Sequence, residues 1–224
     1  MSGDGRTVHG SRFTVHGSRF TVHGSRFTVH GSRFTVRASK GLGDRVEFST
    51  QIDGREEQIK SLFAQTFAAS EGADEGRLIA ALVERLLNTT PREDLFVFTQ
   101  AEGEALIAAA IFSRLTYSED ARSVFILSPM AVATERQKQG VGQALLKEAL
   151  NALSKEGVDV AITYGDPAFY GKVGFEPLDE DTAAAPLPLS QPVGWIGQPL
   201  QEPALLPLKG RCTCVAALDD PAIW

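Results

Sequence analysis

Histidine is missing from most of this 224-residue chain, because all four histidines lie within its first 30 residues. The rest of the sequence has no imidazole, which excludes Ser-His-Asp and Cys-His catalysis and histidine-based zinc sites there. Cysteine is scarce too, and Cys212 and Cys214 are the only two. So few thiols favour a reduced, cytoplasmic setting over a disulfide-rich secreted one.

Long apolar runs and a basic surplus are also absent. The longest uninterrupted apolar run, Ala105–Phe112, has eight residues, against about 20 for a membrane-spanning helix. The first residues contain no apolar stretch of the kind that forms a secretory signal, so none is expected. Residues 1–43 hold seven of the 22 basic residues and one of the 28 acidic residues, so residues 44–224 carry a net charge of −12. An acidic domain argues against nucleic acid or an anionic membrane as partner.

Residues 1–43 consist largely of one unit, Thr-Val-His-Gly-Ser-Arg-Phe, repeated four times over residues 7–34. A period of seven is typical of coiled coils, but each unit contains glycine and only two apolar residues, so helix propensity is poor. The regularly spaced histidines leave metal binding as an alternative interpretation. Because this composition cannot bury a core, we expect a disordered, functionally silent tail.

Residues 44–224 are expected to form one α/β domain with a mixed, partly antiparallel sheet flanked by helices. Glu102 and Gly103 mark the turn of an antiparallel hairpin. Eight of the eleven prolines lie from Pro177 onward, so the section 177–209 is expected to be irregular. The expected strands are 45–50, 95–99, 105–114, 123–132, 158–163 and 211–218; the expected helices are 53–67, 75–87 and 142–154, with one or two helical turns at 167–172.

A glycine-rich loop, residues 137–144, stands between a strand and the strongest helix. A helix N-terminus offers unpaired N–H groups and the positive end of the helix dipole, which suits a pyrophosphate. Gly140 and Gly142 carry no β-carbon to hold the anion away, and Arg136 and Lys138 add positive charge. The loop lacks the pattern of a P-loop and the third glycine of a Rossmann fingerprint. A helix with a flexible glycine start is the alternative without a ligand.

A proline stands inside the strand that precedes this loop. Pro129 cannot donate to a sheet ladder, so within Phe125–Val132 it predicts a bulge or a place where two strands part. The backbone donors from Met130 to Val132 would then be free to bond a ligand. A simple edge strand is the alternative.

A third segment, Gly165–Phe175, has the composition of a turn, a short helix and a second glycine turn. It would place Tyr170 at the carboxyl end of a central strand, where α/β proteins usually bind ligands. Phe169 and Tyr170 can equally be core aromatics. The two cysteines fall on one face of a strand as buried thiols; a metal site would need further ligands, and we predict no metal.

Together these segments resemble the GNAT superfamily of acyl-CoA-dependent N-acyltransferases. Gln137–Gly142 matches its Q/R-x-x-G-x-G/A pyrophosphate motif, with glutamine where many members have arginine. Ser128–Val132 looks like the splayed strand that precedes the motif, and Tyr170-x-x-x-Gly174-Phe175 looks like a later one. The ordered set spans about residues 45–177, and the proline-rich section beyond it is not general to the family.

The resemblance implies a single GNAT-like domain in which a splayed strand pair binds acetyl-CoA and an amine attacks directly, without a covalent acyl-enzyme. The amide of Met130 or Val132 would polarise the thioester carbonyl. Tyr170 would protonate the departing thiolate, which a modestly lowered pKa of Tyr170 would favour; a glutamate or a water chain is left to take the amine proton. The implied acetyl-CoA-binding residues are Met130, Ala131, Val132, Gln137, Lys138, Gln139, Gly140, Val141, Gly142, Gln143, Ala144 and Phe169.

The expected acceptor is a small-molecule amine or a protein amino group, and the expected state is a cytoplasmic monomer or homodimer without nucleic-acid or membrane partners. Two other functions stay open: a non-catalytic acyl-CoA-binding module of the same fold, and a nucleotide-binding α/β protein. Consumption of acetyl-CoA across an amine panel separates catalysis from binding alone. Competition by adenosine dinucleotides tests the nucleotide-binding alternative.

Overall fold

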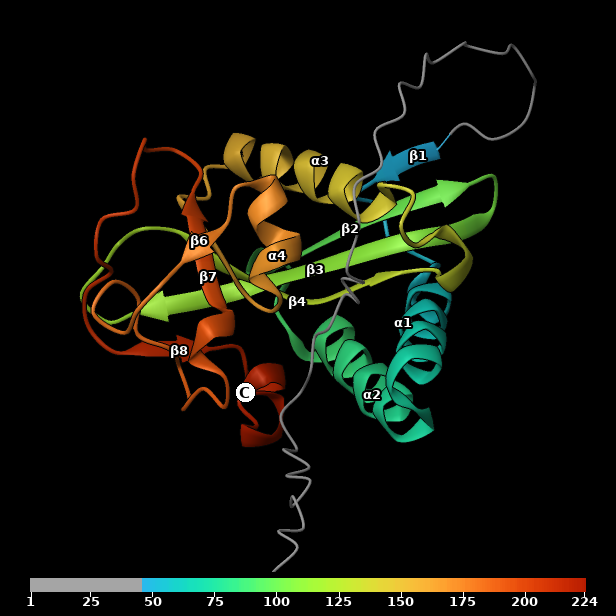
Figure 1. Ribbon diagram of the computed structural model, residues 1–224, viewed down its shortest axis with the longest axis horizontal. Coiled ribbons are helices and arrows are strands. Elements are labelled where there is room, and N and C mark those ends of the chain that lie inside the picture. The colour runs from blue at the N-terminus through green and yellow to red at the C-terminus, as the bar shows by residue number, and fades with distance from the viewer. Residues whose placement is uncertain (1–45) are drawn as a thin grey trace, which may run out of the picture.

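The computed structural model describes residues 46–224 (Figure 1). The heptapeptide repeats, and with them the expected tail, lie outside the described residues. The strands are β1 (Val46–Ser49), β2 (Leu95–Glu102), β3 (Ala105–Tyr117), β4 (Val124–Val132), β5 (Val160–Tyr164), β6 (Glu176–Pro177), β7 (Trp195–Pro199) and β8 (Cys212–Cys214). The helices are α1 (Glu56–Glu71), α2 (Ala73–Thr89), α3 (Val141–Lys155) and α4 (Pro167–Tyr170).

One sheet organises the domain, with strand order β1-β2-β3-β4-β5-β7-β6 and with β8 paired to β3. Only β4 and β5 run parallel, and every other described pair is antiparallel. This confirms the mixed, partly antiparallel sheet expected from the sequence. The β2–β3 hairpin also forms where expected, and Gly103 takes the positive φ of 59° that its tight turn requires.

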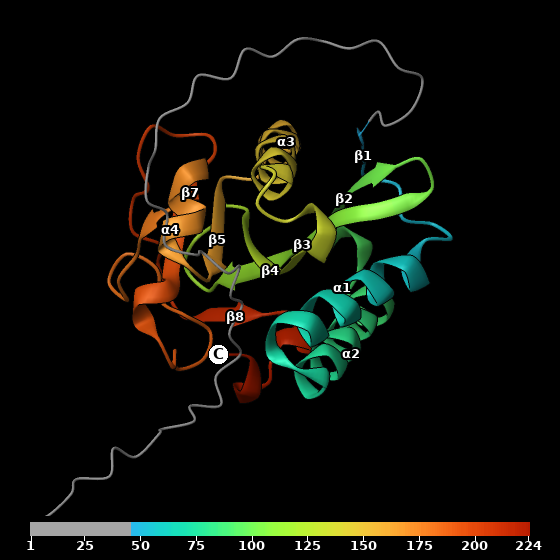
Figure 2. The ribbon, with the colours of Figure 1, turned by 45° about the vertical axis from the view of Figure 1, so that its right-hand side comes forward.

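Helices cover both faces of the sheet, with α3 on one face and α1 and α2 on the other (Figure 2). The apolar side of α3 is fully buried at Leu145, Leu146 and Leu153, because these residues recur at helical spacing and pack on the sheet. The α1–α2 pair buries Ile59, Phe63 and others in the same way. The two apolar clusters therefore occupy opposite faces, which we call the α3 face and the α1–α2 face.

The section 177–209 is mostly irregular, as expected, but it contains the strand β7, which the sequence did not predict. This strand pairs antiparallel with β5, from Val160↔Pro199 to Tyr164↔Trp195. Its sequence is short, contains glycine and ends in proline, so its pairing with β5 rather than its own pattern makes it a strand. The expected last strand, 211–218, is shorter than predicted: β8 ends at Cys214 and a 3₁₀ turn follows at Ala216–Leu218.

Candidate functional site

The parallel strands β4 and β5 separate halfway along β4. They pair from Val124↔Val160 to Leu127↔Thr163, and no pair follows. At the same point β4 forms a bulge, because Ser128 and Pro129 together lie opposite a single β3 residue, Ile111. We call the place where β4 leaves β5 the fork. The bulge and the parting of strands expected from the proline are both confirmed.

Beyond the fork, β4 still pairs with β3, and this register sets the direction of its backbone. The Ala133 amide donates to the Ile107 carbonyl at 2.8 Å. Backbone groups alternate along an antiparallel ladder, so Ala131 also faces β3, whereas Met130 and Val132 direct N–H and C=O away from it. The backbone groups of Met130 and Val132 thus face the gap between β4 and β5. Of the three donors that the sequence suggested for a ligand, the Ala131 amide is excluded, because it bonds to β3.

The Val132 carbonyl is held from two sides. It accepts hydrogen bonds from the Gln137 side-chain amide at 3.0 Å and from the Thr66 hydroxyl of α1 at 3.4 Å. Gln137 therefore spans the start of the loop and fixes its position against β4. The Met130 groups and the Val132 N–H remain directed at the gap.

The loop between β4 and α3 is ordered by local and distant contacts. Gly140 has φ of 83° and caps α3, and Lys138 also has a positive φ, 62°. The Gln139 side-chain amide donates to the Glu135 carbonyl at 2.8 Å, which leaves the Gln139 backbone N–H out of this contact. Arg136 forms an ion pair with Glu102 at the end of β2, so its charge is already engaged by a carboxylate. The sequence predicts that Arg136 adds positive charge beside the loop, and this ion pair offsets that charge.

The N-terminus of α3 presents unpaired backbone donors. Its first intrahelical bond runs from the Ala144 amide to the Gly140 carbonyl, at 3.0 Å. The N–H groups of Val141, Gly142 and Gln143 precede that bond and have no acceptor within the helix. Three donors and the positive end of the dipole therefore sit at the start of α3, as an anion site requires.

Gly142 brings the predicted residues together. A β-carbon there would lie 3.0 Å from Met130 Cε, 3.2 Å from Phe169 Cζ and 3.2 Å from Val132 Cγ2. The start of α3 thus packs directly on the open part of β4 and on the aromatic ring of Phe169 in α4. Segments that lie far apart in the sequence are therefore in direct contact at this point.

Tyr170 lies on the α3 face next to the fork. Asp166 caps its short helix by accepting from the Ala168 amide at 2.8 Å, and Pro167 starts the first turn. The Tyr170 ring packs edge-on against Phe169 and Phe175, with centroids 5.0 and 5.7 Å away. Tyr170 is therefore both a buried aromatic and a neighbour of the fork, and the two interpretations offered by the sequence are compatible.

Burial raises the pKa of Tyr170 well above its usual range, and this outweighs the opposing effect of the Thr163 hydroxyl. The sequence argument invoked a lowered pKa, and the structure corrects it: the phenol stays protonated at neutral pH. Thr163 itself donates to the Leu127 carbonyl across the fork, at 3.0 Å. The Thr163 side chain therefore joins the last paired residues of β4 and β5 at the fork.

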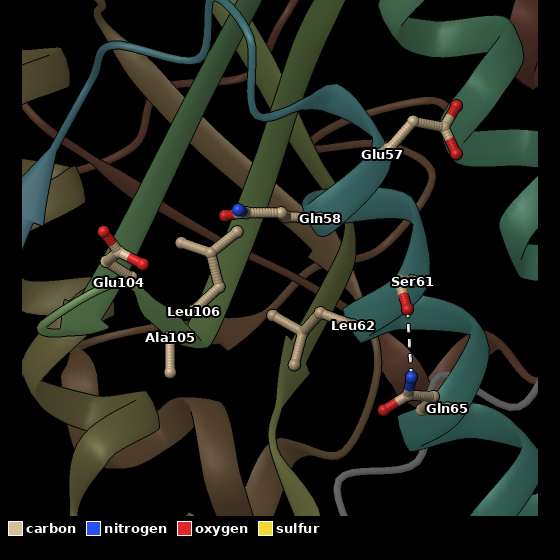
Figure 3. A pocket seen from close by; sticks show the side chains of 8 residues that line it. All are labelled: Glu57, Gln58, Ser61, Leu62, Gln65, Glu104, Ala105 and Leu106. Atoms are coloured by element: carbon tan, nitrogen blue, oxygen red, sulfur yellow. Dashed lines mark hydrogen bonds between the residues drawn. The ribbon is translucent and has the colours of Figure 1, made fainter.

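A separate groove of about 470 Å³ lies between α1 and the β2–β3 turn (Figure 3). Within it, the Gln65 amide donates to the Ser61 hydroxyl at 2.9 Å. The Glu57 carboxylate points away from the turn and pairs with Lys60 at 2.7 Å. The lining residues are Glu57, Gln58, Ser61, Leu62, Gln65, Glu104, Ala105 and Leu106. None of the site residues predicted from the sequence is among them.

Comparison with known proteins agrees with the pattern of motifs. A family model for the acetyltransferase (GNAT) domain matches residues 91–177. The uncharacterized N-acetyltransferase YjhQ of Escherichia coli K12 is 30% identical over 161 residues, which cover 70% of this chain and 84% of YjhQ. The chain belongs to the GNAT family. A second E. coli K12 relative, the N-acetyltransferase YhbS, is 34% identical over 90 residues, 38% of this chain and 53% of YhbS.

Solved GNAT structures share the fold. The structure of E. coli YhbS in complex with CoA superposes with a TM-score of 0.64 at 21% identity, covering 83% of this chain and 97% of that one. A GNAT acetyltransferase from Brucella melitensis in complex with acetyl-CoA gives 0.62 at 17% identity, covering 79% and 99%. The single GNAT-like α/β domain expected from the sequence is therefore confirmed.

Some contacts of this GNAT site had no signal in the sequence. Thr66 lies 66 residues before the carbonyl it bonds, and Glu102 lies 34 residues before Arg136. Across residues 46–224, no cluster of three His, Cys, Asp or Glu side chains is arranged to hold a metal ion. No helix in that same part of the chain is long and apolar enough to cross a membrane.

Proposed function

We propose that this GNAT protein transfers the acetyl group of acetyl-CoA to a primary amine, of a small molecule or a protein, by direct attack. The observation that carries the proposal is the open stretch of β4, where the Met130 N–H and C=O and the Val132 N–H face the gap between the fork and the N-terminus of α3. An extended amide-containing chain such as pantetheine can bond to that stretch as an added strand does. A pyrophosphate at its far end then meets the donors of α3.

The loop and the open strand divide the binding between them. The backbone amides from Gln139 to Gln143 hold the pyrophosphate, whereas the Ala144 amide, which the sequence also suggested, is already bonded to the Gly140 carbonyl. Gly140 leaves room for the anion, because no atom lies within 4 Å of where its β-carbon would be. Phe169 and Gly142 flank the chain that follows. Gln137 positions the loop through the Val132 carbonyl, which gives it an indirect part in binding.

Amide direction selects the group that polarises the thioester. Met130 is the first residue after the bulge whose N–H faces the gap, and it lies next to the fork. Its amide stabilises the oxygen of the tetrahedral adduct, where negative charge develops. No protein nucleophile takes part, which fits a catalytic domain without histidine.

Tyr170 supplies the proton for the leaving thiolate. Its raised pKa keeps the phenol protonated. A thiolate that leaves inside the same apolar surroundings is also destabilised by burial, so its affinity for a proton rises together with that of the phenol. The transfer therefore stays close to balanced, although each group alone is a weak acid.

The test combines turnover with binding. Acetyl-CoA consumption is followed against a panel of spermidine, tyramine, lysine amide and a peptide with a free amino terminus, and CoA affinity is measured by calorimetry. We expect turnover with at least one amine, and a roughly 10²–10⁴-fold lower kcat for Tyr170→Phe with CoA affinity unchanged. CoA binding without turnover on any amine would establish the non-catalytic module instead. A Tyr170→Phe variant that retains more than about a third of kcat, with chemistry rate-limiting, would remove Tyr170 from the mechanism.

A further inference from the structure

Ser128 stands at the fork with a hydroxyl that is sealed inside the protein. Its side chain is 4% exposed. Within residues 46–224, its Oγ has no hydrogen-bond partner. A buried hydroxyl without a partner is destabilising, and native structures rarely keep one unless a ligand or water completes it. Ser128 lies at the strand bulge, beside the place where the proposed reaction occurs. The missing hydrogen-bond partner can therefore be one of the reacting groups.

The bulge turns Ser128 to the opposite side of the sheet from Tyr170. Leu127 and Met130, on either side of the bulge, belong to the cluster on the α3 face. Ile111, which faces the bulge from β3, belongs to the cluster on the α1–α2 face. Ser128 follows Leu127 directly and lies opposite Ile111, so its side chain is directed to the α1–α2 face; Met130 returns to the α3 face because the bulge inserts one extra residue.

The hydroxyls of Tyr170 and Ser128 therefore lie at the fork on opposite faces of the sheet. Tyr170 donates its proton to the leaving sulfur from the α3 face, where the start of α3 binds the pyrophosphate of CoA. The attacking nitrogen needs its own approach, and the other face of the fork is where it does not compete with the cofactor chain for space. A serine oxygen there can accept an N–H hydrogen bond, which directs the nitrogen lone pair toward the carbonyl carbon.

We propose that Ser128 Oγ accepts a hydrogen bond from the attacking primary amine and positions it for acetyl transfer. This inference rests on the proposed function. As the N–C bond forms and the C–S bond breaks, the Tyr170 proton passes to the thiolate sulfur. The amine nitrogen, positively charged after attack, loses one proton to water, and the tyrosinate regains one from water, so the protons balance over a cycle. Ser128 keeps its own proton and acts by positioning alone.

Stability and activity should respond in opposite directions to removal of this hydroxyl. Ser128→Ala deletes a buried polar atom that nothing satisfies in the free protein, so its Tm stays equal to the wild-type value or rises. The KM for the amine rises or kcat falls, and kcat/KM drops by about tenfold, the size expected for one lost hydrogen bond. Acetyl-CoA affinity stays the same, because the loop and the open strand supply it. Ser128→Cys, which retains the volume but is a weak hydrogen-bonding group, gives the same pattern.

Ser113 provides a matched control. It too is fully buried with an unpartnered Oγ, but it lies inside the sheet, paired with Leu95 and Ile126 away from the fork. Ser113→Ala should raise or preserve Tm in the same way and leave kcat/KM unchanged. The comparison separates an effect of the fork from a general effect of removing a buried hydroxyl.

The experiment measures Tm, acetyl-CoA affinity, and kcat and KM for the amine that the wild-type chain acetylates fastest in the panel above. Wild-type turnover with a tenfold loss confined to the Ser128 variants supports the proposal. Ser128→Ala with kcat/KM within twofold of wild type overturns it while the proposed function stands. Loss of acetyl-CoA affinity, or an equal loss in Ser113→Ala, also overturns it. No turnover by the wild-type chain overturns the proposed function and the role of Ser128 with it.

Discussion

A charge placed at the start of α3 gives the sharpest test of where the pyrophosphate binds. Gly140 has φ of 83° and no atom within 4 Å of its β-carbon position. Asparagine and aspartate are the side chains that best tolerate this left-handed conformation, at about 1 kcal/mol for either. Gly140→Asn and Gly140→Asp therefore carry nearly the same backbone strain and bulk, and differ by one negative charge.

The expected difference follows from Coulomb's law. One carboxylate at about 5 Å from a phosphate charge repels it by about 1–3 kcal/mol for effective dielectric constants of about 80 to 20. CoA should thus bind about 5- to 150-fold more weakly to Gly140→Asp than to Gly140→Asn. Stability should not follow affinity, since a carboxylate at a helix N-terminus interacts favourably with the dipole.

Calorimetry with CoA, alongside thermal unfolding of both variants, measures the two quantities independently. Raising the salt concentration to about 1 M shortens the screening length to about 3 Å and should reduce the difference in CoA affinity between the two variants. Equal CoA affinities for the Asp and Asn variants would refute the reasoning, because a pyrophosphate on the loop amides cannot ignore that charge. A difference in CoA affinity that persists unchanged at high salt would show that the shape of the side chain, and not its charge, weakens binding.

Three further results are expected. Glu102→Gln should lower the free energy of unfolding by up to about 1 kcal/mol, because Arg136 loses its charged partner; urea titration measures this, and an unchanged midpoint would show that the ion pair is neutral to stability. Burial raises the pKa of Tyr170 above its unfolded value of about 10, so the stability it provides is present below about pH 10 and lost as the pH rises further. Tyr170→Phe should therefore unfold with less pH dependence above pH 10 in urea titrations, and an identical slope would contradict the burial argument. Burial also raises the pKa of Cys212 to about 12 and of Cys214 to about 11, so iodoacetamide at pH 7.5 should label both thiols far faster in urea than in the folded chain, by mass spectrometry.

Local signals in the sequence were enough for most of the sheet and helices. The helical spacing of Leu145, Leu146 and Leu153 predicted α3, and the turn residues after β2 predicted the hairpin. Pro129 predicted the fork because the missing N–H is a property of the residue itself. These elements share one feature: the information that forms them lies within a few residues of where they form.

The parts that escaped prediction depend on distant partners. Trp195–Pro199 is a strand because β5 is beside it, and its own composition gives no alternation. Arg136 turns to a carboxylate 34 residues away, and the pKa of Tyr170 rises because Phe169 and Phe175 enclose it. Ser128 is an ordinary strand residue in the sequence, and only the count of buried hydrogen-bond partners distinguishes it.

The gap between β4 and β5 also bears on how this protein avoids aggregation. Unpaired N–H and C=O groups on a strand usually lie at the rim of a sheet, where a strand from another chain can add to them. The Met130 N–H and C=O and the Val132 N–H are directed into the middle of the sheet, beneath α3 and beside α1. A strand from another chain can reach these groups only by entering between β4 and β5, because they do not lie at an open edge of the sheet. The protein can therefore keep these hydrogen-bonding groups available to a ligand without presenting them at a sheet edge, where another copy could pair with them.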